Sequence, residues 1–158
     1  MACSIDLTDL IDEAADAAGV PRAIALSVAM QESGVCQWNP DGSIVTGSSG
    51  ELGVFQLMPA TAAALGVDPT DVNQNIQGGV RFLAQLYQRY ADWSLAVQHY
   101  NGSGPAAVAY AQQVMARAAL LGAGAPPVVA LSTVDLSSLP MPLLIGAAAV
   151  FLVMMLFD

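Results

Sequence analysis

The stretch that decides the fold is Ile24-Ala25-Leu26-Ser27-Val28-Ala29-Met30-Gln31-Glu32-Ser33-Gly34. It is almost wholly apolar until Gln31 and Glu32. Pro21, just before it, is a residue that favours the first turn of a helix, and Gly34 is a residue that commonly follows the last turn. The pattern therefore predicts a helix that carries Glu32 in its last turn.

Glu32 is an unusual residue for the end of an apolar helix. The C-terminal end of a helix carries partial negative charge, and apolar neighbours remove water from the carboxyl, so both effects favour the protonated form. A carboxyl that stays protonated near neutral pH can serve as a general acid. The alternative is an ordinary surface glutamate beside a glycine that ends the helix.

The composition excludes several classes of protein. The 158 residues carry a net charge of -9, with four basic residues and no lysine, so the chain cannot neutralise the phosphates of a nucleic acid. The single histidine, His99, and two cysteines are too few for a metal centre, and no cofactor is expected. Cys3 and Cys36 are treated as free thiols by default, although they could pair in an oxidising compartment if the N-terminus folds back.

Helical spacing and helix-end residues recur along the chain. Ile76, Val80, Leu83 and Tyr87 are expected to form the core face of a helix. Residues 36–53 are rich in turn formers and predict a loop or a small hairpin. In the last helix, Val108, Gln112, Met115 and Leu120 are candidates for packing. Helices are expected over residues 6–18, 21–33, 59–65, 75–87, 92–101 and 105–122.

Gln56 is the one polar side chain in an apolar run. A buried amide without partners costs about 1–3 kcal/mol, so Gln56 must bond to backbone, to another side chain or to a ligand.

Four short motifs appear in order along the chain. They are Glu32-Ser33, residues 50–59 (G-x-x-G-x-x-Q-L-M-P), residues 75–83 (N-I-x-x-G-x-x-F-L) and residues 96–101 (A-x-x-x-Y-N). Together they resemble the motifs of the SLT-type lytic transglycosylases. The resemblance implies a mostly α, lysozyme-like α+β fold with a small hairpin or loop that flanks a cleft.

The resemblance also implies a reaction and a set of site residues. The reaction is cleavage of the β-1,4 bond between N-acetylmuramic acid and N-acetylglucosamine in peptidoglycan, with a 1,6-anhydro product. Glu32 would be the acid and base, and the hydroxyl of Tyr100 would hydrogen-bond and orient it. The expected substrate-binding residues are Ser33, Ser48, Ser49, Gln56, Met58 and Asn101.

Three positions depart from the family pattern. The usual serine nine residues before the motif glutamine is Gly47 here, so Ser48 and Ser49 are the nearest candidates. The usual small residue after the first motif glycine is Glu51, which is either a second carboxylate at the cleft or a solvated loop residue. The usual Y-N-A-G continues here as residues 100–103, Y-N-G-S.

Two other functions fit the same residues. A hydrolytic muramidase would use Asp41 or Glu51 as the second carboxylate of an inverting pair. A non-catalytic wall-binding or structural membrane protein would keep the fold without using Glu32.

The C-terminal part has a different composition. We expect a transglycosylase domain over residues 1–122, a linker over 123–138 and a C-terminal transmembrane helix over 139–158, because residues 142–157 carry no charge. The alternative for this last segment is a helix buried in a partner assembly. An anchored wall enzyme that lacks a recognisable signal peptide suggests a bacteriophage protein of the virion membrane, with other virion membrane or capsid proteins as partners. A tail-anchored bacterial enzyme is the alternative.

Overall fold

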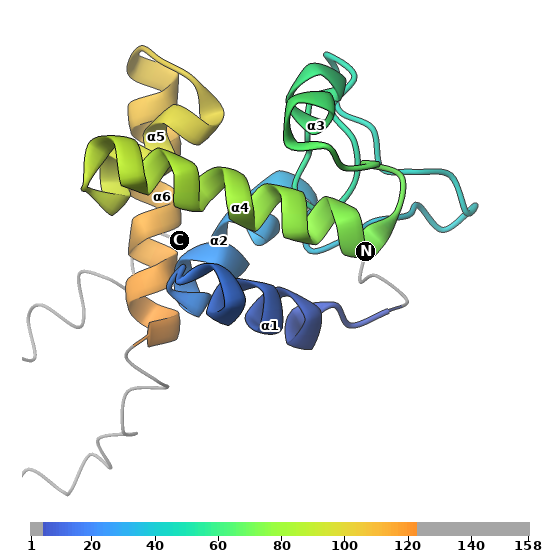
Figure 1. The fold of residues 1–158 in the computed structure, drawn as a ribbon, viewed down its shortest axis with the longest axis horizontal. Coiled ribbons are helices and arrows are strands. Elements are labelled where there is room, and N and C mark those ends of the chain that lie inside the picture. The colour runs from blue at the N-terminus through green and yellow to red at the C-terminus, as the bar shows by residue number, and fades with distance from the viewer. Residues whose placement is uncertain (1–4, 123–158) are drawn as a thin grey trace, which may run out of the picture. The chain divides into compact units, whose positions relative to one another are not determined.

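The computed structural model of the chain describes residues 5–122, and six α-helices lie within this range (Figure 1). The predicted helices are present, although α4 is longer at both ends than predicted. The helices are α1 (Thr8–Ala18), α2 (Arg22–Ser33), α3 (Pro59–Leu65), α4 (Val72–Tyr90), α5 (Trp93–Asn101) and α6 (Pro105–Gly122).

Helix α2 packs against two other helices. It contacts α1 and α6, while α4 contacts α1 and α5, and α5 in turn contacts α6. The buried face of α2 consists largely of small and β-branched side chains, Ile24, Ala25, Val28 and Ala29. Small side chains allow α1 and α6 to approach α2 closely.

The predicted end of α2 is confirmed. Gly34 adopts a left-handed conformation with a φ of 67°, and the N–H of Val35 donates to the carbonyl oxygen of Ala29 at 3.2 Å. A left-handed residue at this position is a common helix ending, in which glycine carries no steric penalty. Glu32 therefore lies in the last turn of α2, as the sequence predicts.

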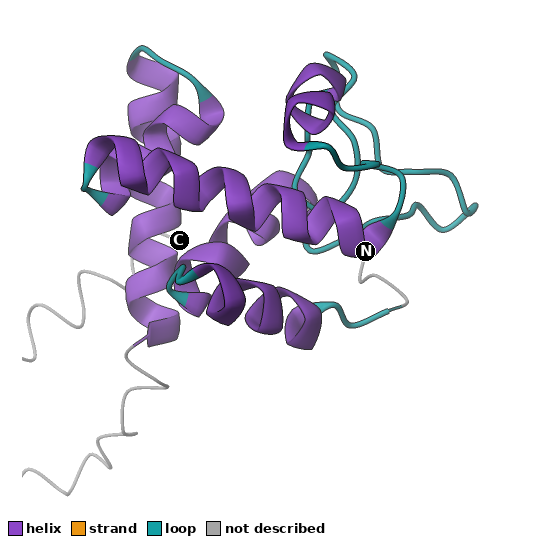
Figure 2. Cartoon of the chain, viewed as in Figure 1, coloured by secondary structure: helices purple, strands orange, loops and turns teal. Residues whose placement is uncertain are grey.

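Between α2 and α3 the chain forms a loop, not a regular sheet. Figure 2 shows this region without strand arrows. The pairing within it consists of isolated antiparallel bridges, Trp38 with Ile44, Thr46 with Leu52, and Leu52 with Leu57. The structure thus takes the loop form of the predicted "hairpin or loop".

The buried side chain of Gln37 fixes one part of this loop. Its Oε1 atom accepts a hydrogen bond from the N–H of Val54 at 2.9 Å. Its Nε2 atom donates to the carbonyl oxygens of Pro69 and Thr70 at 3.1 and 3.2 Å. Gln37 therefore joins the loop to the segment that precedes α4.

The side chain of Asn75, on α4, also fixes the backbone of this loop. Its Oδ1 atom accepts from the N–H of Phe55 at 2.9 Å, and its Nδ2 atom donates to the carbonyl oxygens of Leu52 and Pro69 at 2.8 and 2.9 Å. The side chain is fully buried. Asn75 is the hydrogen-bond partner of the buried N–H of Phe55, and it adds a second bond to each of the two carbonyl oxygens.

Helix α4 also packs closely on the loop. A Cβ atom at Gly79 would overlap the ring of Phe55, so glycine is needed for this approach. Of the predicted core face, Ile76, Val80 and Leu83 are buried. Tyr87 is 37% exposed, and its ring stacks on Trp93 with 4.1 Å between ring centroids, so its assignment to the core is wrong.

Of the four residues predicted for the packing face of α6, Met115 packs against the core, and the assignment of the other three is wrong. Val108 is 41% exposed and Leu120 is 72% exposed, and Gln112 is also exposed. The prediction favoured the larger apolar side chains, whereas the contact with α2 and α5 is made mainly by alanines that allow close approach. The buried residues of α6 are Ala107, Tyr110, Ala111, Val114 and Ala118.

The predicted fold class needs a correction in its membrane part. None of the helices within residues 5–122 has the length and apolar character needed to cross a membrane, and residues 139–158 lie outside the described residues, as does the predicted linker. The prediction of a transmembrane helix used hydropathy alone, which measures the transfer of side chains and does not by itself specify a helix. The domain boundaries stay predictions.

The default of two free thiols is also wrong for Cys36, which is disulfide-bonded in the structure. Separation along the sequence does not limit how closely two sulfur atoms approach in a folded chain. Cys3 lies outside the described residues.

Replacing Asn75 with alanine should destabilise the fold. The substitution leaves the buried N–H of Phe55 without its partner, and one such loss costs about 1–3 kcal/mol. It also removes one of the two hydrogen bonds to the carbonyl oxygen of Leu52. Urea denaturation should show a clear fall in the free energy of unfolding. Asn73→Ala, at an exposed position of the same helix, should change little. Equal stability of the two variants would contradict the anchoring role of Asn75.

Candidate active site

The carboxyl of Glu32 is partly buried at the end of α2. Burial removes water from the charged form and raises the pKa of Glu32 above its ordinary value. A hydrogen bond from Tyr110 acts in the opposite direction, and the negative charge of Glu51 raises the pKa further. The net effect favours a protonated carboxyl, as the sequence predicts.

Tyr110 is the hydrogen-bond partner of Glu32. It lies on the buried face of α6, and its hydroxyl donates to Oε1 of Glu32 in a short hydrogen bond. Burial, followed by the charge of Glu32, raises the pKa of Tyr110 far above its usual range. The hydroxyl therefore stays protonated and can always donate.

Tyr100 makes a different contact from the predicted one. Its hydroxyl donates to the carbonyl oxygen of Phe55 at 2.7 Å, not to Glu32. Burial, with a smaller contribution from the charge of Glu32, raises the pKa of Tyr100 well above its ordinary value. Tyr100 therefore joins α5 to the loop beside the acid, and Tyr110 occupies the orienting position predicted for Tyr100.

Ser33, a predicted substrate contact, is engaged within the protein. Its hydroxyl donates to the carbonyl oxygen of Val54 at 2.8 Å and accepts from the N–H of Cys36 at 3.0 Å. These bonds attach the loop to the end of α2, directly after Glu32. We infer from these bonds that Ser33 positions the loop.

Of the three kinds of partner predicted for Gln56, the structure shows bonds to backbone. Its Nε2 atom donates to the carbonyl oxygens of Gly53 and Val45 at 2.8 and 3.2 Å. The residue has a φ of 45°, a left-handed conformation that is uncommon for a side chain with a Cβ. The loop thus holds Gln56 in one strained orientation, in which its Oε1 atom is free of these bonds.

The other loop candidates lie in an exposed turn. Ser48 and Ser49 are exposed, and the N–H of Ser49 donates to Oε2 of Glu51 at 2.9 Å. Backbone N–H groups, its own and that of Ser49, lower the pKa of Glu51. Asp41 is exposed on a different turn, where hydrogen bonds from Ser43 lower its pKa. Glu51 influences Glu32 electrostatically, and Asp41 is not among the groups that do so.

Met58 and Asn101 end the list of predicted contacts. Met58 is 41% exposed and precedes α3, and Asn101 is exposed as the last residue of α5. Both side chains are accessible, and their contacts with substrate stay predictions.

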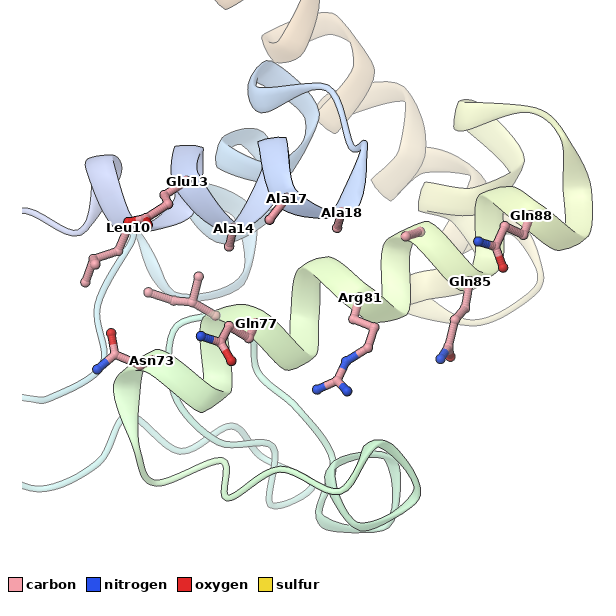
Figure 3. A pocket seen from close by; sticks show the side chains of 12 residues that line it. Leu10, Glu13, Ala14, Ala17, Ala18, Asn73, Gln77, Arg81, Gln85 and Gln88 are labelled. Carbon is pink, nitrogen blue, oxygen red and sulfur yellow. The ribbon is translucent and has the colours of Figure 1, made fainter.

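A groove of about 690 Å³ lies elsewhere, between α1 and α4 (Figure 3). Small side chains such as Ala14 and Ala18 line it on α1, and Gln77 and Arg81 line it on α4. None of the predicted site residues lines this groove. Across residues 5–122, no group of His, Cys, Asp and Glu side chains could hold a metal ion.

Tyr110 is the functional residue that the sequence reasoning missed. It is the one aromatic residue of α6, and it shares a face with Val114 and Ala118 at helical spacing. An aromatic residue with a polar hydroxyl on a face of small side chains is a signal that this hydroxyl meets a partner across the interface. That signal could have identified Tyr110, though not its partner.

A mostly helical domain that presents one desolvated acid beside an irregular loop is the arrangement of lysozyme-like domains. The family model for the transglycosylase SLT domain matches residues 9–119, and the chain belongs to this family.

Individual proteins agree with this assignment. The transglycosylase of Enterobacteria phage PRD1 is 37% identical over 116 residues, which cover 69% of this chain and 41% of the phage protein. An inactive Glu-to-Gln mutant of lytic transglycosylase Slt from Pseudomonas aeruginosa shares the fold with a TM-score of 0.62 at 19% identity, over 72% of this chain and 23% of that chain. The 70 kDa soluble lytic transglycosylase of Escherichia coli has a TM-score of 0.52 at 25% identity, over 72% and 19%. The chain thus spans less than half of the phage protein and about a quarter or less of the two enzymes of known structure.

Replacing Tyr110 with phenylalanine should raise the pKa of Glu32. The lost hydrogen bond stabilises the carboxylate, so its removal makes the protonated form more favourable. NMR titration of the side-chain carboxyl carbon of Glu32 would measure the shift. Tyr87→Phe, which removes a hydroxyl that makes no contact with Glu32, should leave the titration unchanged. A pKa that stays constant or falls in Tyr110→Phe would contradict the assignment.

Proposed function

We propose that this domain is a peptidoglycan lytic transglycosylase that cleaves the β-1,4 bond between N-acetylmuramic acid and N-acetylglucosamine and leaves a 1,6-anhydro end. The observation that carries the proposal is the partly buried carboxyl of Glu32, which has a raised pKa and a hydrogen bond from Tyr110. Membership of the SLT family supports it.

In the first step, the protonated carboxyl of Glu32 gives its proton to the bridging oxygen as the bond from that oxygen to the anomeric carbon breaks. The acetamido oxygen of the muramic sugar forms a temporary bond to the anomeric carbon and supplies the nucleophile that a second enzyme carboxylate supplies in most glycosidases.

In the second step, the carboxylate of Glu32 takes the proton of the 6-hydroxyl of the same sugar. The oxygen of that hydroxyl bonds to the anomeric carbon, and the acetamido oxygen leaves. The hydrogen bond from Tyr110 is suited to this cycle because it stabilises the carboxylate that exists between the two steps. The proton taken from the 6-hydroxyl returns the carboxyl to its protonated form, which burial favours.

The substrate contacts belong to the same proposal. Gln56 and Asn101 would bind acetamido or hydroxyl groups, Met58 would give an apolar contact, and Ser48 or Ser49 would contact the strand from the loop. The exposure of Met58, Asn101 and the two serines supports access to them. Ser33 is left out of this set because its hydroxyl is bonded to the loop.

A hydrolytic muramidase is the second candidate. The electrostatic effect of Glu51 on Glu32 favours it, because a second carboxylate could activate water on the other face of the sugar. The two functions differ in the end that they leave on the muramic sugar.

We further propose that the protein acts on the bacterial cell wall during phage entry, as a component of the particle. Similarity to the transglycosylase of phage PRD1 supports this setting. Detection of the protein in purified particles by an antibody would test it, and its presence only in lysates of infected cells would contradict it.

Mass spectrometry of the muropeptides released from purified peptidoglycan tests the activity. The protein should release 1,6-anhydro ends, and Glu32→Gln should lower the rate by at least about 100-fold because the general acid is lost. Glu13→Gln, the same change on a different helix, α1, should keep the wild-type rate. Reducing ends would indicate a muramidase, and undiminished release by Glu32→Gln would show that Glu32 is not the acid.

A further inference from the structure

Glu51 is held in one place by the turn around it. Its Oε2 atom accepts from the N–H of Ser49 at 2.9 Å. Its carbonyl oxygen accepts from the N–H of Gly47 at 2.8 Å, and the carbonyl oxygen of Gly47 accepts from the N–H of Gly50 at 3.1 Å. Residues 47–51 therefore form a closed turn that presents the carboxylate in a fixed position.

The amide oxygen of Gln56 points to the same place. A Cβ atom at Gly47 would overlap Oε2 of Glu51 and would lie 2.6 Å from Oε1 of Gln56. The amide nitrogen of Gln56 is bonded to two backbone carbonyls, so the orientation of its oxygen is fixed. Two hydrogen-bond acceptors thus converge above a residue without a side chain.

Within residues 5–122, no single donor bonds to both Oε2 of Glu51 and Oε1 of Gln56. Glu51 accepts from a backbone N–H, and no hydrogen bond is formed to Oε1 of Gln56. Paired acceptor oxygens repel each other unless an N–H or O–H group lies between them. The arrangement fits an acetamido N–H or a hydroxyl of a sugar, groups in which glycan strands are rich.

The loop that carries Glu51 is bonded next to the acid. Ser33 joins it to α2 through Val54, and Tyr100 joins it to α5 through Phe55. The groups that act electrostatically around the acid come from three elements: Tyr110 and Arg117 on α6, Tyr100 on α5, and Glu51 on the loop.

The pKa values of Glu32 and Glu51 are shifted in opposite directions. Burial raises the pKa of Glu32, and backbone N–H groups lower the pKa of Glu51. Two neighbouring carboxyls with pKa values pushed apart are a common feature of glycoside-cleaving sites. The family pattern has a small residue at this position, where this chain has Glu51.

We propose that Glu51 is a second functional carboxylate, which stays ionised, binds an N–H or O–H group of the sugar together with Oε1 of Gln56, and stabilises the positive charge that develops near the anomeric carbon. The inference rests on the proposed transglycosylase activity. Glu51 neither gains nor loses a proton, so the proton balance between the leaving oxygen and the 6-hydroxyl stays with Glu32. Its negative charge also keeps Glu32 protonated to higher pH.

The test compares Glu51→Gln and Glu51→Asp in the full chain by the rate of muropeptide release across pH. Glu51→Gln should lower kcat on the order of a hundredfold. It should also move the high-pH limb of the profile to lower pH, because the pKa of Glu32 falls when the neighbouring negative charge is removed. Glu51→Asp keeps the charge and should restore part of the rate and the position of the limb. Glu13→Gln is the matched control and should behave as wild type.

The outcomes separate this inference from the proposed function. An unchanged rate and an unchanged high-pH limb in Glu51→Gln would overturn the role of Glu51 while wild-type anhydro products still support the proposed function. Reducing ends from the wild type would overturn the proposed function instead. In that case, loss of release in Glu51→Gln would still support Glu51 as a functional carboxylate, and full release would overturn it.

Discussion

The structure depends on the partial burial of one carboxyl, that of Glu32, at the end of α2. Removal of water would make the charged form very unfavourable if nothing compensated for it. The hydroxyl of Tyr110, on α6, provides that compensation by a hydrogen bond that lowers the pKa of Glu32. Both the protonated carboxyl and the carboxylate can therefore form. A single group with this balance can give a proton and later take one back. The packing of α2 against α6 is therefore a requirement of the proposed catalysis as well as of the fold.

The loop beside Glu32 is positioned by polar groups that face inward. The side chains of Gln37 and Asn75 accept hydrogen bonds from its backbone N–H groups. The hydroxyls of Tyr100 on α5 and Ser33 on α2 donate to its carbonyl oxygens. Each of these bonds satisfies a backbone group of a segment that has no regular sheet of its own. The loop can thus carry a strained residue, Gln56, in a fixed orientation. Rigid support behind a polar surface is what a glycan-binding loop requires.

The sequence predicts features that depend on local chemistry. The glycine endings and the last turn that carries Glu32 follow from residues that are close together in the chain, and the structure has them. Contacts between distant segments could not be predicted in the same way. The motif resemblance selected Tyr100, and only the packing of α6 on α2 shows that the hydroxyl of Tyr110 reaches Glu32 instead. The face of α6 was misassigned because alanines make the close contact. The bonding of Cys36 likewise depends on tertiary proximity.

In the proposed reaction, one carboxyl closes the muramic sugar on its own 6-hydroxyl without the participation of water. The most direct test is digestion of purified peptidoglycan in water labelled with a heavy oxygen isotope, followed by mass spectrometry of the new muramic ends. Transglycosylation leaves no isotope in these ends, because the oxygen that bonds to the anomeric carbon comes from the sugar itself. Incorporation of one labelled oxygen at each new end would show that water is the nucleophile and would contradict the account.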